Sequence, residues 1–216
     1  MTVRVKICGL RDAASIAAAI EGGAQYVGFV FYPQSPRAIG TKEAANLVAL
    51  LPTTIMSVGL FVNPGDEELL TVLRTVPLQM IQLHGSEPLE RVVAIKSLSG
   101  LPVIKAIGIA DMSDIKVAQS YEDAVDYLLL DAKPSQSGLP GGNATKFDWS
   151  VLRGLTFKAP WMLAGGVTES NMVEAVAMTG ARILDVSSGV EDSPGSKNPQ
   201  KIKAFLAKSH QIETCC

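Results

Sequence analysis

The chain has 216 residues, a formal net charge of −2 and 47% hydrophobic residues, which fits one larger domain with a substantial core. The 19 basic and 21 acidic residues are spread evenly, so no electrostatic footprint for nucleic acid or an anionic membrane is present. No uncharged apolar run reaches membrane-spanning length, and the N-terminus lacks the apolar core of a signal peptide.

Strand-like and helix-like segments alternate along the chain. Residues 3–7 alternate apolar and charged side chains, the period of a strand that breaks at Gly9, and Asp12 can cap a helix over residues 13–21. Further strands are predicted at residues 26–31, 57–62, 80–83, 103–106, 127–130, 161–164 and 183–186. Helices are predicted at residues 41–52, from 63–64 through 73, at 89–98 and 113–119, after 147–149, and at 169–178 and 199–208.

Eight strand–helix units of about 27 residues each predict a single-domain α/β fold, a (β/α)8 TIM barrel. A doubly wound open sheet is less favoured, because the glycine fingerprints for dinucleotides and nucleoside triphosphates are absent from the sequence. We expect the barrel to cover residues 1–208 and residues 209–216 to form a disordered tail.

In such a barrel the carboxyl ends of all strands face one mouth, and polar residues collect there. The candidates are Cys8, Arg37, His84, Asp131 and Asp185. Asp131 follows four apolar residues, so its carboxylate is poorly solvated and suits an acid, unless it caps a helix or joins a salt bridge. Arg37 can clamp a carboxylate, and Asp185 favours hydroxyl binding over chemistry.

Two of these candidates stay open on the residues alone. Cys8 ends the first strand, where a helix begins, and it is either a reactive thiol or a small buried hydrophobe. His84 either binds a substrate or holds a loop.

Glycines and serines follow three neighbouring strands. They are Gly142 after the sixth strand, Gly165 and Gly166 after the seventh, and Ser187, Ser188 and Gly189 after the eighth. Glycine lets backbone N–H groups approach an anion closely, and a short helix after the eighth strand would add its dipole. Three such loops together favour a phosphate site over simple turns.

With these residues the chain resembles the phosphoribosylanthranilate isomerase family of tryptophan biosynthesis. The matching stretches lie at residues 6–10, 28–32, 35–37, 59–63, 82–85, 129–131, 147–149, 163–168 and 185–191. One departure is Ala144, which stands where the family commonly has the last glycine of the loop after the sixth strand, and it puts a backbone contact there in question.

The resemblance implies an Amadori rearrangement of N-(5-phosphoribosyl)anthranilate by general acid–base catalysis, without a metal or another cofactor. It assigns Cys8 as the base and Asp131 as the acid. The substrate's phosphate would lie toward the seventh and eighth strands and its anthranilate carboxylate near Arg37. The partner is therefore a small phosphosugar, with no nucleic acid and no membrane.

Two other functions compete with this one, and the first is another phosphosugar barrel enzyme. A metal-dependent epimerase would need more histidines than His84 and His210, and a Schiff-base aldolase would need a strand-end lysine, for which only Lys105 comes near. A non-catalytic phosphometabolite-binding protein would have no need of Cys8 and Asp131 together. The number and spacing of the cysteines do not form a disulfide framework, which indicates that the protein works in the reducing cytoplasm. The oligomeric state stays open.

Overall fold

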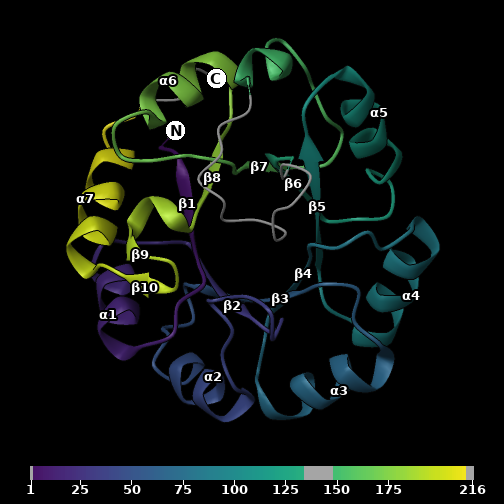
Figure 1. The fold of residues 1–216 in the computed structure, drawn as a ribbon, viewed down its shortest axis with the longest axis vertical. Coiled ribbons are helices and arrows are strands. Elements are labelled where there is room, and N and C mark those ends of the chain that lie inside the picture. Colours follow the sequence, from purple (N-terminus) through teal and green to yellow (C-terminus); the bar gives the residue numbers. More distant parts are fainter. Residues whose placement is uncertain (1, 134–147, 213–216) are drawn as a thin grey trace.

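The computed structural model describes residues 2–133 and 148–212. Strands β1 to β8 close into one parallel barrel (Figure 1). The strands are β1 (Arg4–Cys8), β2 (Tyr26–Val30), β3 (Met56–Phe61), β4 (Met80–Leu83), β5 (Val103–Ile109), β6 (Tyr127–Ala132), β7 (Trp161–Leu163) and β8 (Ile183–Val186). Each strand pairs with the next in sequence, and β8 pairs with β1. The predicted (β/α)8 barrel is confirmed.

Helices form a ring outside the strands (Figure 1). They are α1 (Ala13–Glu21), α2 (Thr41–Val48), α3 (Asp66–Thr75), α4 (Leu89–Ser99), α5 (Met112–Ser120), α6 (Met172–Thr179) and α7 (Pro199–Ser209). Helix α1 begins and ends where the sequence predicts, because the Asp12 side chain accepts from Ser15 N–H and Gly22 follows the last turn.

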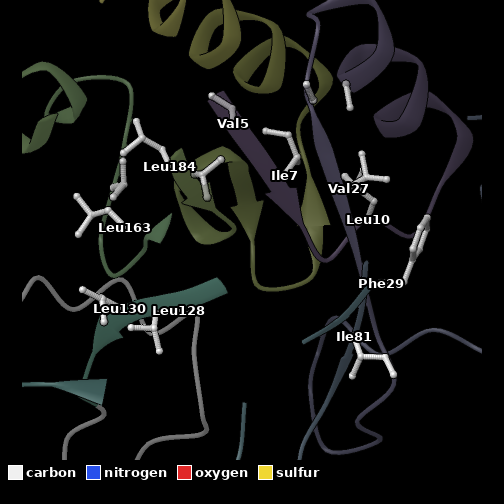
Figure 2. Packing of buried hydrophobic residues seen from close by; sticks show 14 of the residues in the cluster. Val5, Ile7, Leu10, Val27, Phe29, Ile81, Leu128, Leu130, Leu163 and Leu184 are labelled. Atoms are coloured by element: carbon white, nitrogen blue, oxygen red, sulfur yellow. The ribbon is translucent and has the colours of Figure 1, made fainter. Parts of the chain in front are cut away.

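The core has two layers, because successive residues of a strand point to opposite faces. Outward-facing apolar side chains pack between the strands and the helices, as Val5, Ile7 and Leu184 do in Figure 2. Inward-facing side chains such as Met80 and Leu129 fill the barrel interior. This alternation decides which side chains near the strand ends can reach the mouth.

The segment after β6 differs from the prediction. Where residues 147–149 were expected to lead into a helix, the structure has only a 3₁₀ helix, η1 (Trp149–Leu152), because Gly154 takes the left-handed conformation (φ +71°) two residues later. Helix α3 begins at Asp66 rather than at residues 63–64. There Asn63 instead holds the loop, donating its N–H to Glu87 Oε1.

The segment after β8 differs from the prediction in its second part: a short helix was expected there, but the hairpin that follows it was not. The segment consists of the 3₁₀ helix η2 (Ser188–Val190) and a short hairpin of β9 (Glu191–Ser193) and β10 (Ser196–Lys197). Figure 1 shows this hairpin beside α7 and α1. It brings two charged side chains to the mouth, as described below.

The end of the chain is described as far as Ile212, which is buried, and α7 ends at Ser209. The rest of the expected tail, residues 213–216, lies outside the described residues. Within the described ranges, every helix is too short or too polar to cross a membrane.

Candidate active site

Lys6 and Cys8 lie two residues apart on β1 and therefore face the same side, the barrel interior. Lys6 is fully buried, and its Nζ lies 2.8 Å from Oδ1 of Asp185 on β8. Cys8 sits nearer the mouth and is 4% exposed. Burial raises the pKa of the Cys8 thiol, the Lys6 charge opposes that rise and the Asp185 charge adds to it.

Gly28 on β2 leaves room for these two groups. It is the strand partner of Cys8, and a Cβ there would lie 2.9 Å from Cys8 Sγ and 3.4 Å from Lys6 Nζ. Any side chain at this position would displace the thiol. The glycine therefore has a packing reason beyond strand geometry.

Asp131 lies on the inward-facing row of β6, two residues after Leu129. Its Oδ1 accepts from the Ala132 N–H at 2.7 Å, and its Oδ2 lies 3.3 Å from His84 Nε2. On the other side of the imidazole, the Gln82 Nε2 lies 2.9 Å from His84 Nδ1. An amide nitrogen can only donate, so Nδ1 accepts and the neutral ring carries its proton on Nε2, facing Asp131.

Arg37, in the loop after β2, is buried and bound by Glu191 at two points. Its Nε donates to Oε1 at 2.8 Å and its Nη2 to Oε2 at 2.7 Å. Lys197 donates to the same Oε1 at 2.7 Å. Burial alone would raise the pKa of the Glu191 carboxyl, but the hydrogen bond from Arg37 and the charge of Lys197 outweigh it and hold the pKa below its usual value.

This charge cluster reaches the loop after β8. Lys197 Nζ also donates to the Ser187 carbonyl and hydroxyl oxygens, both at 3.0 Å. The Ser187 hydroxyl in turn donates to the Cys8 carbonyl at 3.1 Å. The chain of contacts therefore runs from Arg37 to the end of β1.

The loop after β7 is built from two left-handed glycines, Gly165 (φ +77°) and Gly166 (φ +74°). Asn171 donates to the Gly166 carbonyl at 2.9 Å, which turns that oxygen toward α6. Among the described residues, the Gly165 and Gly166 N–H groups have no hydrogen-bond acceptor. They are available to an anion, next to Ser188 and Gly189 in η2 after the adjacent strand.

The structure brings most of the predicted site residues to one end of the barrel. Cys8, His84, Asp131 and Asp185 project from the carboxyl ends of the strands into the interior, and Arg37 is tied to the segment after β8. Gly142 lies outside the described residues.

Four residues of the site were not predicted from the sequence: Lys6, Gln82, Glu191 and Lys197. The signal for the first two was available, because Lys6 and Gln82 stand two residues before Cys8 and His84 and so share their faces. Glu191 ends a stretch that matches the family, which was a signal for it, whereas nothing local marked Lys197; both depend on the unpredicted hairpin.

Lys105 has no place in the mouth. It follows the inward-facing Ile104, and its Nζ is held in a buried ion pair 2.8 Å from Glu87 Oε2 and donates to the Gly85 carbonyl at 2.7 Å. Within residues 2–133 and 148–212, no three of the His, Cys, Asp and Glu side chains form a group that could hold a metal ion.

The amino-acid sequence is similar to those of known proteins. Residues 5–208 match the family model of N-(5'-phosphoribosyl)anthranilate (PRA) isomerase. The N-(5'-phosphoribosyl)anthranilate isomerase of Paracoccus denitrificans is 51% identical over 210 residues, covering 97% of this chain and 98% of that protein.

Solved structures agree with the sequence match. The phosphoribosyl anthranilate isomerase from Thermotoga maritima superposes with a TM-score of 0.87 at 37% identity, covering 97% of this chain and 100% of that one. A second isomerase structure, in complex with reduced 1-(o-carboxyphenylamino)-1-deoxyribulose 5-phosphate, has a TM-score of 0.84 at 36% identity with the same coverage.

Proposed function

Since this chain belongs to the N-(5'-phosphoribosyl)anthranilate isomerase family, we propose that its barrel mouth performs the family's reaction with Cys8 as base and Asp131 as acid. The reaction is the Amadori rearrangement of N-(5-phosphoribosyl)anthranilate to 1-(2-carboxyphenylamino)-1-deoxyribulose 5-phosphate, a step of tryptophan biosynthesis. The observation that carries the residue assignment is that both side chains face the barrel interior from the ends of different strands, β1 and β6.

The first step needs an acid. Protonation of the furanose oxygen lets the ring open, and the nitrogen lone pair forms a C1=N iminium. Asp131 is fixed for this task, with Oδ1 on the Ala132 N–H and Oδ2 toward His84. The carboxyl group thus has one held orientation before the substrate arrives.

The second step needs a base. The iminium acidifies the proton on C2, and the Cys8 thiolate removes it, so that the C2–H electron pair becomes the C1=C2 bond of an enolamine. The enolamine then tautomerises to the ketone. A thiolate rather than a thiol is required, and its population is governed by the charges around Cys8.

Substrate placement follows from the charge distribution at the mouth. Arg37 is the proposed partner of the anthranilate carboxylate, with Glu191 fixing the orientation of its guanidinium. Gly165, Gly166, Ser187, Ser188, Gly189 and Gly142 are the proposed phosphate residues, with His84 and Asp185 toward the sugar hydroxyls. We also place the enzyme in the cytoplasm, where a base thiol such as Cys8 stays reduced.

The catalytic assignment is tested with Cys8→Ala and Asp131→Asn in a fluorescence assay that follows the loss of phosphoribosylanthranilate. Each variant is expected to lower kcat by roughly 10²- to 10⁴-fold, the usual contribution of a general acid or base, with KM changed far less. A deuterium label at C2 should give a larger isotope effect without Cys8 and a smaller one without Asp131. Folded variants that keep wild-type kcat would exclude this pair as the catalytic groups.

A further inference from the structure

We propose that Lys6 is a positioning residue for this reaction, whose ammonium group, anchored by Asp185, stabilises the thiolate form of Cys8. The inference rests on the proposed role of Cys8 as the base. It assigns to the interior ion pair a chemical task besides filling the barrel.

The geometry supports the assignment from three strands. Lys6 has no contact with solvent, and its Nζ lies 2.8 Å from Asp185 Oδ1, so the ammonium group cannot turn away. One point beside Gly28, where a Cβ would stand, lies 2.9 Å from Cys8 Sγ and 3.4 Å from Lys6 Nζ. Sulfur and nitrogen therefore converge on the same small space, and β2 contributes no side chain to separate them.

Three charged groups face the thiol. Lys6 comes from β1, Asp185 from β8, and Lys197 from β10, where it is paired with Glu191. The Lys6 and Lys197 charges lower the pKa of the thiol and the Asp185 charge raises it. Lys6 Nζ, and no Asp185 atom, is among the three atoms nearest the point beside Gly28 that Cys8 Sγ also borders, so the ammonium is placed to dominate. The ion pair as a whole therefore favours the thiolate, although Asp185 alone disfavours it.

The proton transfer to Cys8 explains why stabilising the thiolate affects the reaction rate. When the base takes the C2 proton, the S–H bond forms, the C2–H bond breaks, and the sulfur changes from thiolate to neutral thiol. Burial raises the pKa of the Cys8 thiol, so the thiolate population at neutral pH limits the step. A fixed cation beside the sulfur increases that population without entering the reaction itself.

The test is a titration of the Cys8 thiol in the free enzyme, read by ultraviolet thiolate absorbance. The same titration of a matched Cys8→Ser protein is subtracted, which removes the signal of Cys215 and Cys216. Lys6→Met is expected to raise the pKa of Cys8 and to lower its thiolate fraction at neutral pH roughly tenfold or more. Asp185→Asn is expected to shift the pKa in the opposite direction.

Lys105→Met is the matched control. It also removes a buried lysine from a buried ion pair, with Glu87, but Lys105 points to the outer face of β5, away from Cys8 in the interior. The Cys8 titration of this variant should equal that of the wild type. The pH profile of kcat/KM in Lys6→Met, which reports the free enzyme, should move to higher pH by the same amount as the titration.

Wild-type titration in a folded Lys6→Met protein would overturn the proposal and leave the ion pair a purely structural feature. Where Lys6→Met does not fold because Asp185 is left unpaired, the Lys6→Met/Asp185→Asn protein replaces it. Its Cys8 pKa should still lie above the wild-type value, since Lys6 Nζ rather than Asp185 borders the space beside the sulfur, and an unchanged or lower value overturns the proposal. If Cys8 is not the base, a separate result would show it, because Cys8→Ala would then keep the wild-type kcat.

Discussion

Glu191 holds the Arg37 guanidinium by two parallel hydrogen bonds, at 2.8 Å and 2.7 Å, across 154 residues of sequence. The contact locks the orientation of the arginine before any substrate is bound. It also joins the loop after β2 to the hairpin after β8. The proposed binding regions for the substrate's carboxylate and phosphate are therefore held together by this contact.

Glu191→Gln should therefore weaken both binding and stability. We expect KM to rise more than kcat falls, and the free energy of unfolding to drop by about 3 kcal/mol, because Arg37 and Lys197 lose their buried counter-charge. Steady-state kinetics and denaturant titration measure the two effects. Asp192→Asn is the control, since Asp192 is exposed and pairs with Lys201; equal effects in both variants would contradict the special role of Glu191.

The positions that end apolar strands were predictable from the sequence. Cys8 and Asp131 follow runs whose length and period identify strands, and the carboxyl ends of parallel strands meet at one mouth. Local capping chemistry likewise fixed both ends of α1 through Asp12 and Gly22. In each case the deciding interactions lie within a few residues of the position.

The interior charges were not predictable in the same way. Alternating Arg4 and Lys6 with valines indicates a strand with one polar, solvated face, yet Lys6 is fully buried. Its partner Asp185 is 179 residues away, and no local pattern reports such a pair. Glu191 and Lys197 depend on a hairpin of only a few residues with a register shift, too short for a periodic signal.

The raised pKa of Cys8 predicts the direction of the pH dependence. The base must be deprotonated, so kcat/KM should rise with pH through the alkaline range, on a limb that lies above the pKa of an ordinary thiol. A pH–rate profile of the wild type checks this. A plateau already reached at neutral pH would contradict a thiol base with a raised pKa.

The same shift acts on stability with a defined sign. The folded pKa of Cys8 lies above the unfolded one, so the thiol's contribution to folding is full below the unfolded pKa and is lost as the pH rises through the folded pKa. Cys8→Ala should therefore lose less stability than the wild type between neutral and alkaline pH. Denaturant titrations of both proteins at the two pH values give the comparison.

Gln82 should control the His84 tautomer. In Gln82→Met the donor to Nδ1 disappears, so the ring proton is no longer confined to Nε2 opposite Asp131. We expect kcat to fall about tenfold, a part of the ~10²–10⁴-fold contribution of the acid itself, with little change in KM. Nitrogen NMR of the ring reports the tautomer directly. Gln79→Met, just before β4, where the side chain accepts from Ser57 N–H, should leave kcat unchanged; an equal loss there would mean that β4 is simply disturbed.

Gly166 tests the phosphate site, and the chain offers a close control. Gly166 and Gly154 are both left-handed, at φ +74° and +71°, so alanine costs each about 1 kcal/mol of backbone strain. A Cβ on Gly154 would have nothing within 4 Å, and Gly154 lies outside the mouth. Gly166→Ala should therefore raise KM severalfold or more, because the strained loop moves the N–H groups proposed to bind the phosphate. Gly154→Ala should lose comparable stability while its KM stays unchanged. Isothermal titration with inorganic phosphate separates the anion from the rest of the substrate, and equal phosphate affinity in the two folded variants would remove the loop after β7 from the site.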